Sequence, residues 1–385
     1  MEYFLTEQQQ VIRDLARKIA EEKIKPLRAE LDESEEFPWA IMKDLADTDM
    51  FGVFIPKEYG GVGGGCLELC LVMEELSRLC SGVAVSYAAS ALGSLTLLEY
   101  GSDAQRQKYL PAIASGQRLA AFALTEETAG SDASAIKTTA IREKEGYRLN
   151  GTKRFITNGG EAEIYTIIAL TDKEKGARGA SAFLVEKETP GFSFGRKEKK
   201  MGIRTSATRE LVFEDCLIPG ENLIGREGMG FIMALRLLDG SRPVIGAQAV
   251  GLAQGALEAA VDYARQRIQF GHPIIALQAV QHMLADMATQ VEAARSLVYA
   301  TARTIDSGAK NFGKEAAMAK VFASDVAMRI TTDAVQILGG VGYMRDYPVE
   351  KMMRDAKITQ IYEGTNQVLR NEIAAELRKS KTISG

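Results

Sequence analysis

The spacing of apolar residues changes twice along this chain, and this change limits the possible folds more than any other feature. After the capping-box pattern Thr6-Glu7-Gln8-Gln9, the apolar residues of the first segment recur every three or four positions, as on one face of a helix. They are Val11, Ile12, Leu15, Ala16 and Ile19. Residues 67–98 are rich in Leu, Ala and Met, which suits buried helices. We therefore predict a helical domain over residues 1–120.

The middle of the chain has the two-residue period of β-strands. Residues 147–155 alternate around Asn150-Gly151, a dipeptide typical of a hairpin turn. Short β-like runs follow at 165–170, 182–185 and 211–213, separated by glycine and charged turns. These patterns predict a small β-barrel-like domain over residues 121–228.

The last third returns to the helical period. Its apolar residues step by three or four, as in the seam of a bundle: Leu277, Val280, Leu284, Met287, Val291, Ala294 and Leu297. Residues 316–337 and 349–377 continue in the same way. We predict a four-helix bundle over residues 229–385 and an α+β protein overall. Because the elements do not alternate as βαβ, and no Gly-x-Gly-x-x-Gly motif follows a strand, a dinucleotide fold of the Rossmann type is excluded.

Charge and hydropathy exclude some classes of partner. The chain has 385 residues, with 47 Lys or Arg against 51 Asp or Glu, so its net charge is −4. A mildly acidic chain has no general attraction for nucleic acid or anionic membranes. No apolar run approaches the ~20 residues of a membrane span. We therefore expect neither nucleic-acid binding nor a membrane span.

The cysteines have no metal-ligand partners at suitable spacing, and the chain has only two His. We expect Cys66, Cys70, Cys80 and Cys216 to be free thiols in a reducing compartment, and no metal site. The first residues lack the basic and then apolar layout of a signal peptide. The expected location is the cytoplasm, or the mitochondrial matrix if a transit peptide has been removed.

The segment Arg354–Asn366 carries the most chemistry in the sequence. It places one carboxylate, Glu363, directly before a glycine, a hydroxyl and an amide, with apolar and aromatic neighbours. An apolar pocket raises the pKa of a carboxyl group toward neutrality, as a general base requires. Gly364 lets the backbone approach a flat ligand, and Thr365 and Asn366 can donate hydrogen bonds to a phosphate or a sugar. Taken alone, the pattern also fits an ordinary helix end capped by Gly and Thr.

Together with six further blocks, this segment resembles the acyl-CoA dehydrogenase family. The blocks occur in that family's order and at about its spacing: Pro56–Gly61, Leu124–Asp132, Phe155–Gly159, Arg267–Gly271, Gln336–Gly340 and Tyr347–Glu350. The resemblance covers nearly the whole chain. It implies a three-domain fold that binds FAD.

The reaction that the resemblance implies is the α,β-dehydrogenation of an acyl-CoA thioester to the trans-2-enoyl-CoA. In that family a glutamate removes the α-proton, the β-hydrogen leaves as hydride to flavin N5, and hydrogen-bond donors stabilise the enolate-like oxygen. By position the glutamate is Glu363. Some relatives carry the base on another helix, just before an arginine. Here Gly240 and Ser241 precede Arg242 and carry no carboxylate, which favours Glu363.

Cofactor contacts are carried over from the family by position. In the middle segment they are Phe122, Leu124, Thr125, Phe155 and Thr157. The two threonines would lie at the flavin edge, and Phe155 against the ring. Thr365 and Gln367 would reach the phosphates and ribose. Without the resemblance, Phe155 and Thr157 are ordinary strand residues.

A second group of cofactor contacts would come from a neighbouring subunit. By position it comprises Arg267, Gln269, Phe270, Gln336, Gly339 and Gly340. An arginine suits a pyrophosphate because its planar fork gives paired hydrogen bonds. By itself, Arg267 is more typical of a solvated helix residue. The shared site implies an obligate oligomer, by analogy a homotetramer.

The substrate contacts carried over are Ser131, Asp239, Arg242, Tyr362 and Gly364. Ser131 would meet the CoA pantetheine or pyrophosphate, or it simply belongs to a Gly-Ser-Asp turn. Asp239 would face the adenine end of CoA. Arg242 would order the site of the base, or it is a surface ion-pair residue.

The acyl pocket in this family is built from the helix that corresponds to Val83–Leu95. In this chain none of the side chains of that segment is charged, and they are small apart from Tyr87. The segment has no arginine that could bind a distal carboxylate. The expected substrate is short- or medium-chain, possibly branched or alicyclic. Chain length is not fixed by the sequence, because one methylene changes discrimination by only ~1–3 kcal/mol.

The resemblance implies an electron-transfer flavoprotein as the acceptor of electrons. Three other functions stay open at this point: an acyl-CoA oxidase that uses oxygen, a non-catalytic CoA-ester-binding protein, and a nucleic-acid-binding member of the fold. The length of the chain disfavours the oxidase. The retained Glu363, Thr157 and Arg267 disfavour the non-catalytic protein, and the charge balance disfavours the nucleic-acid binder.

Overall fold

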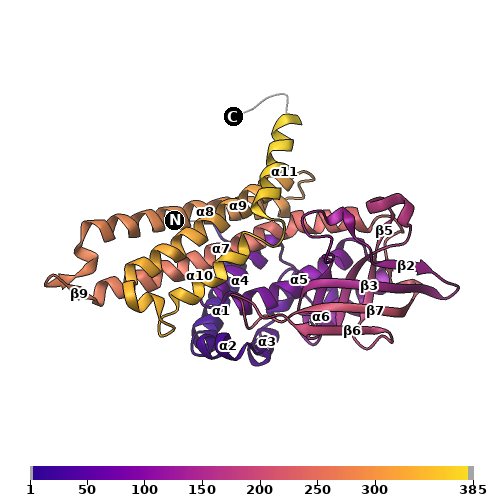
Figure 1. The fold of residues 1–385 in the computed structure, drawn as a ribbon, viewed down its shortest axis with the longest axis horizontal. Coiled ribbons are helices and arrows are strands. Elements are labelled where there is room, and N and C mark those ends of the chain that lie inside the picture. The colour runs from indigo at the N-terminus through magenta and orange to yellow at the C-terminus, as the bar shows by residue number, and fades with distance from the viewer. Residues whose placement is uncertain (1–2, 380–385) are drawn as a thin grey trace.

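The computed structural model describes residues 3–379, and three regions follow one another along the chain. A helical region is followed by a β-sheet and then by a bundle of long helices (Figure 1). The sheet lies at one end of the long axis, and the bundle extends to the opposite end. This is the predicted order of helical, β and helical regions.

Six α-helices form the first region. They are α1 (Glu7–Ile19), α2 (Arg28–Ser34), α3 (Trp39–Ala46), α4 (Cys66–Ser77), α5 (Ser81–Tyr100) and α6 (Asp103–Ala114). The predicted capping box is confirmed, because the Thr6 hydroxyl accepts the Gln9 backbone N–H at 3.2 Å. On the predicted face, Ile12, Ala16 and Ile19 are buried, whereas Val11 is exposed.

Helices α4 and α5 are buried along almost their whole length, as their composition predicted. Two helices of the described residues, α5 and α7 (Gly230–Gln266), are long and apolar enough to cross a bilayer by length and composition. The sequence-based statement that no apolar run approaches that length was therefore wrong. Both helices lie mostly buried within the protein, which accounts for their apolar character.

Eight strands form the sheet of the middle region. They are β1 (Ala120–Ala123), β2 (Thr139–Arg142), β3 (Gly146–Thr157), β4 (Ile164–Leu170), β5 (Ala180–Glu186), β6 (Phe192–Lys197), β7 (Thr208–Pro219) and β8 (Leu223–Ile224). Their order is β6-β7-β3-β2-β4-β5-β8, and β1 pairs in parallel with β4. Strand β1 also contacts β3.

The hairpin predicted at Asn150-Gly151 is wrong. Strand β3 runs straight through this dipeptide, and the turn between β2 and β3 lies before Gly146. Gly151 marks a bulge against β7. The Asn150 side chain accepts the Asp215 backbone N–H at 2.8 Å, and a Cβ on Gly151 would come within 2.6 Å of Thr138. The bulge thus uses the side-chain hydrogen bond of Asn150 and the missing side chain of Gly151. The same two residue types also favour tight turns.

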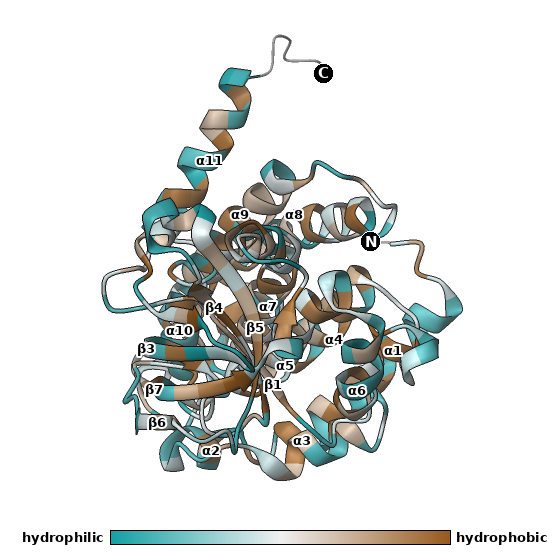
Figure 2. Ribbon diagram, turned by 90° about the vertical axis from the view of Figure 1, so that its right-hand side faces the viewer, coloured by the Kyte–Doolittle hydropathy of each residue, from teal (hydrophilic) through white to brown (hydrophobic). Residues whose placement is uncertain are grey.

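Up to Lys379, the last region contains five α-helices: α7, α8 (Gln278–Asp306), α9 (Gly313–Leu338), α10 (Val349–Thr359) and α11 (Asn366–Lys379). Leu284, Met287, Val291 and Ala294 are buried, as the predicted seam of α8 requires. The predicted helical stretch 349–377 is interrupted, since residues 360–365 form a loop between α10 and α11. Beyond that loop, α11 projects away from the bundle (Figure 2).

Two small strands, β9 (Ile268–Gln269) and β10 (His272–Pro273), form a hairpin between α7 and α8. This hairpin lies at the end of the molecule opposite the sheet (Figure 1). Helix α7 is the central element, because it packs against α4, α5, α8, α9 and strand β5. The two helical regions are also joined by a buried ion pair between Glu74 of α4 and Arg295 of α8, at 2.8 Å.

Candidate active site

The loop between α10 and α11 turns sharply at Glu363. The backbone of Glu363 has φ 56° and that of Gly364 has φ 91°, so two successive residues are left-handed. Glycine adopts this conformation freely, but glutamate does so rarely and at a cost. The Asn366 backbone N–H closes the loop onto the carbonyl of Gln360 at 3.0 Å. The strained residue is the one that the sequence singled out as a base.

The Glu363 carboxylate is enclosed by α7 and α9. The Ser241 hydroxyl of α7 donates a hydrogen bond to Oε2 of Glu363 at 2.7 Å. Burial raises the pKa of Glu363 above its usual range, and Ser241, Arg242 and Lys320 act in the opposite direction. Part of the residue's surface nevertheless stays accessible. An enclosed carboxylate with a raised pKa suits a general base.

Lys320 of α9, which was not predicted from the sequence, holds the loop that carries Glu363. Its ammonium group donates to the carbonyl of Gly364 at 2.8 Å and to Oδ1 of Asn366 at 2.9 Å. Burial lowers the pKa of Lys320 to about 7. No sequence signal indicates this contact, because Lys320 lies within a regular helical pattern on α9 and far from Glu363 in the chain.

The expectation that Asn366 donates to a ligand is wrong. Its side chain is buried and bonds Lys320, Ser324 and Asp325. The Thr365 hydroxyl accepts the Val368 backbone N–H at 3.2 Å and so caps α11. The Thr365 cap thus lies at the start of α11, whereas α10 ends at Thr359 with Gln360 as its C-cap, so the interpretation of a helix end capped by Gly and Thr is wrong. A cofactor contact by Thr365 or by the exposed Gln367 stays a prediction.

Arg242 is a buried residue, so the surface ion-pair interpretation is wrong. Only 5% of it is exposed, and its guanidinium pairs with Asp239 at 2.6 Å and with Glu372 of α11 at 2.8 Å. Burial raises the pKa of Asp239 despite this pairing. Arg242 thus links α7 to α11, the helix that follows the Glu363 loop. This contact is expected of a residue that orders the base. The role of Asp239 at the CoA adenine stays a prediction.

Tyr362 anchors the other side of the loop. Its hydroxyl donates to the side-chain oxygen of Gln248, whose amide donates to Ser81 at 2.6 Å. A side chain at Gly364 would be strained, because the backbone there has φ 91°, and its Cβ would come within 2.9 Å of the end of the Leu369 side chain. The substrate contacts predicted for Tyr362 and Gly364 stay predictions, but both residues border Glu363 directly.

The residues predicted to contact the flavin lie together where strands β1 and β3 end. Phe122 belongs to β1, and Leu124 and Thr125 follow it directly. The carbonyl of Thr125 accepts the Arg154 backbone N–H at 2.8 Å, which brings this segment beside Phe155 and Thr157 of β3. Ser131 lies beyond this segment and is exposed.

Three side chains of this flavin group, those of Phe155, Thr125 and Thr157, are free to meet a ligand, whereas Leu124 is buried in the core and Phe122 packs against it. The Phe155 ring is 56% exposed, although phenylalanine is usually buried, and its backbone is left-handed with φ 57°. Within residues 3–379, the hydroxyls of Thr125 and Thr157 donate to no protein atom. An exposed ring beside two unpaired hydroxyls fits a flat, polar-edged group.

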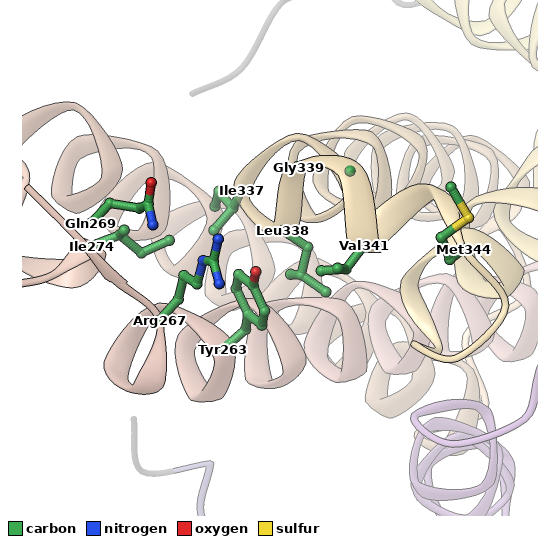
Figure 3. A pocket seen from close by; sticks show the side chains of 10 residues that line it. Tyr263, Arg267, Gln269, Ile274, Ile337, Leu338, Gly339, Val341 and Met344 are labelled. Carbon is green, nitrogen blue, oxygen red and sulfur yellow. The ribbon is translucent and has the colours of Figure 1, made fainter.

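The second predicted group lies at the far end of the molecule. Arg267, Gln269, Gly339 and Gly340 line a cavity of about 550 Å³ together with Tyr263 and other residues (Figure 3). Phe270 and Gln336 do not line this cavity. Phe270 is 87% exposed on the β9–β10 hairpin, with a left-handed backbone at φ 52°. Polar groups and a large exposed ring therefore lie together at this end.

The two predicted groups of cofactor contacts lie far apart within one chain. Helix α7 is 37 residues long, which corresponds to roughly 55 Å. Its first residue, Gly230, packs against β5 of the sheet, and Arg267 follows its last residue. The two predicted groups of cofactor contacts therefore lie toward opposite ends of the chain, one at the sheet and one near β9 (Figure 1).

Comparison with known proteins shows to which family the chain belongs. Family models of the N-terminal, middle and C-terminal domains of acyl-CoA dehydrogenase match residues 6–117, 121–216 and 228–378. The chain belongs to the acyl-CoA dehydrogenase family. As a member, it is an oxidoreductase with the three-domain acyl-CoA dehydrogenase fold.

Three similar proteins cover almost the whole acyl-CoA dehydrogenase chain. The short-chain specific acyl-CoA dehydrogenase of Clostridium acetobutylicum is 47% identical over 379 residues, which are 98% of this chain and 100% of the relative. The structure of butyryl-CoA dehydrogenase from Megasphaera elsdenii has a TM-score of 0.96 and 46% identity, and the match covers 98% and 100% of the two chains. A chain from a study of the electron transferring flavoprotein of Acidaminococcus fermentans has a TM-score of 0.97 and 49% identity, with 99% and 100% covered.

Acyl-CoA dehydrogenases are FAD flavoproteins, so the cofactor is FAD. The exposed Phe155 ring and the unpaired hydroxyls of Thr125 and Thr157 fit its isoalloxazine. The Arg267 guanidinium fits a pyrophosphate. All four cysteines are free thiols, as predicted. Among the described residues, no group of three His, Cys, Asp or Glu side chains is placed so that it could hold a metal ion.

Proposed function

We propose that this protein dehydrogenates short-chain acyl-CoA thioesters between Cα and Cβ, with Glu363 as the base that removes the α-proton. The observation that carries the proposal is the Glu363 carboxylate itself. It is enclosed, its pKa is raised by burial, and a strained backbone presents it beside α7. Anaerobic addition of butyryl-CoA to the holoenzyme tests the proposal through the loss of flavin absorbance.

Removal of the α-proton requires that one carboxylate oxygen be free. Ser241 occupies Oε2 of Glu363, whereas Oε1 accepts no hydrogen bond from residues 3–379. Oε1 is therefore the oxygen that takes the proton. When it does, the negative charge of the carboxylate moves to the thioester carbonyl oxygen of the substrate, where donors must stabilise it.

The backbone supplies such donors next to the base. Within the described chain, neither Glu363 nor Gly364 donates its backbone N–H to another protein atom. Successive free N–H groups in a left-handed turn form a concavity for negative charge. We assign the Glu363 N–H to the thioester oxygen. Bound FAD supplies the acceptor for the β-hydride, and Phe155, Thr125 and Thr157 would hold its flavin ring.

The short-chain assignment rests on one face of α5. Val85, Ala89 and Leu92 follow one another at helical spacing and are buried, yet they do not join the continuous apolar core of the described residues. Thr96 continues the same face with a buried hydroxyl that has no partner. We assign this face to the acyl chain. The likeness to short-chain and butyryl-CoA enzymes supports a short chain.

Enlarging Ala89 is expected to shorten the acyl pocket. In Ala89→Leu, the ratio of kcat/KM for hexanoyl-CoA to that for butyryl-CoA should fall about tenfold or more, because added carbons occupy the space of distal methylenes. Steady-state kinetics with both thioesters measures the ratio. The same substitution at the exposed Ala285 of α8 serves as the control. An unchanged ratio in Ala89→Leu would remove α5 from the acyl pocket.

The separation of the two predicted groups of cofactor contacts supports a homo-oligomer, a homotetramer by analogy, in which one subunit completes the FAD site of another. Glu363→Gln and Arg267→Ala should each be nearly inactive alone. A mixed oligomer of the two should regain about half of the wild-type activity, since one site then combines an intact Glu363 with an intact Arg267. Co-expression with two affinity tags isolates the mixed species.

Two further results decide this shared-site prediction. Arg265→Ala, at an exposed position of α7 two residues before Arg267, should retain FAD and activity. Mixed oligomers that form but stay inactive would place Arg267 outside the shared site.

The proposed acceptor of electrons is an electron-transfer flavoprotein. The structural likeness to a chain from a study of such a flavoprotein supports this choice over oxygen. Reduced enzyme should pass electrons to that protein from the same source much faster than to dissolved oxygen. Stopped-flow reoxidation measures both rates, and rapid reoxidation by oxygen alone would favour the oxidase.

A further inference from the structure

Ser241 is the one side chain of the described protein that donates a hydrogen bond to the carboxylate of Glu363. It is fully buried on α7, next to Arg242. Its hydroxyl has two acceptors in reach, Oε2 of Glu363 at 2.7 Å and the carbonyl of Leu238 at 3.1 Å. A hydroxyl has one hydrogen to donate, and an ionised carboxylate is the stronger acceptor. The hydrogen therefore belongs to Glu363.

We propose that Ser241 is a positioning residue that holds Oε2 of Glu363 and thereby presents Oε1 to the substrate. The inference rests on the proposed role of Glu363 as the base. Ser241 lies far from Glu363 in sequence and belongs to α7, whereas Glu363 belongs to the loop between α10 and α11, so this hydrogen bond fixes the loop relative to α7. Without it, the carboxylate could rotate about its terminal torsion, which is broad for glutamate.

Ser241 differs from the other groups around the base in how it acts. Arg242 is already paired with Asp239 and Glu372, and no hydrogen bond joins it to Glu363. Lys320 bonds the backbone carbonyl of Gly364 rather than the carboxylate. Both cations act on Glu363 only through their charge. Ser241 alone combines direct contact with directionality.

The hydrogen bond from Ser241 also favours the ionised form of Glu363. It lowers the pKa of Glu363, against the larger effect of burial, which raises it. Removing the hydroxyl should therefore raise the pKa of Glu363 further. Because a base must be ionised to accept a proton, the acid limb of the activity profile should then move to higher pH. Arg242 and Lys320, and through Arg242 also Asp239 and Glu372, remain unchanged in such a variant.

The test compares Ser241→Ala, Ser241→Thr and a matched control in the FAD-loaded enzyme. We expect Ser241→Ala to lower the anaerobic rate of flavin reduction by butyryl-CoA by roughly tenfold below the acid midpoint, and to move that midpoint to higher pH. Ser241→Thr keeps a hydroxyl and should restore both. In the control Thr331→Val, a buried hydroxyl bonded only to helix carbonyls is removed, and the profile should not change.

A second readout is independent of turnover. Infrared titration of the Glu363 carboxyl band, assigned by its absence in Glu363→Gln, should show the same upward shift in Ser241→Ala. A titration that superimposes on that of the wild type, or an equal change in Thr331→Val, overturns the proposal. If Glu363→Gln keeps its activity, the base is misassigned, and the infrared titration still decides whether Ser241 holds this carboxylate.

Discussion

Replacement of Glu363 by Gln should lower the rate of flavin bleaching by butyryl-CoA by roughly 10²–10⁴-fold, the range that a positioned general base contributes. Glutamine fits the same space but cannot accept the α-proton. The hydrogen bond from Ser241 can be kept by the amide oxygen, so the loop should retain its shape. The bound FAD and its absorbance should therefore be unchanged. Anaerobic stopped-flow absorbance measures the rate.

The matched control is Glu376→Gln on the exposed part of α11, where the carboxylate pairs only with Lys379. This variant should bleach at the wild-type rate. If Glu363→Gln bleached at more than a tenth of the wild-type rate, another group would have to be the base.

Replacement of Lys153 by Met should lower the free energy of unfolding by roughly 3–5 kcal/mol, the cost of leaving one partner of a buried ion pair without the other. Lys153 of β3 is fully buried, and its ammonium group donates to Glu126 at 2.7 Å and to the carbonyl of Leu124 at 3.0 Å. Burial lowers the pKa of Lys153 to about 8. Chemical denaturation followed by circular dichroism measures the loss.

The same substitution should also weaken FAD binding, because Lys153 holds the segment that carries Leu124 and Thr125. Released flavin fluorescence during heating should rise at a lower temperature than in the wild type. Lys43→Met removes an exposed pair with Asp47 and should change neither quantity appreciably. If Lys153→Met unfolded at the same denaturant concentration as Lys43→Met, the pair would not brace the flavin segment.

The site could be predicted where its residues are close together in the sequence. In the run from Tyr362 to Gly364, the sequence places the carboxylate of Glu363 next to a glycine. In the structure, this carboxylate lies on the loop between α10 and α11. Ser241 and Lys320 could not be predicted, because their contacts with the loop arise only when α7 and α9 pack against it. Their own surroundings in sequence show ordinary helical periodicity.

Local patterns were misleading where the same residues favour two different local structures. Asn150-Gly151 suits a hairpin turn and a bulge equally, and the pairing of Asn150 with Asp215 decides for the bulge. Asn366 was expected to meet a ligand, yet a buried amide can equally satisfy Lys320 and its neighbours. In both cases a long-range partner decided.

Buried charge was the feature least visible in the sequence. Lysines are mostly exposed, but Lys153 and Lys320 are fully buried because carboxylate or carbonyl oxygens meet them. Arg242 shows the same behaviour. Lys153 contacts the flavin segment, and Lys320 and Arg242 lie near the base. At both places the protein must hold a carboxylate or a cofactor in a fixed position.

The most direct test of the proposed function is the flavin absorbance of the purified holoenzyme during anaerobic titration with acyl-CoA thioesters, from butyryl-CoA to longer, branched and alicyclic ones. The account predicts that butyryl-CoA bleaches the flavin fastest and that longer chains bleach it progressively more slowly. Bound flavin that no thioester bleaches would contradict the assignment of Glu363 and of the substrate together.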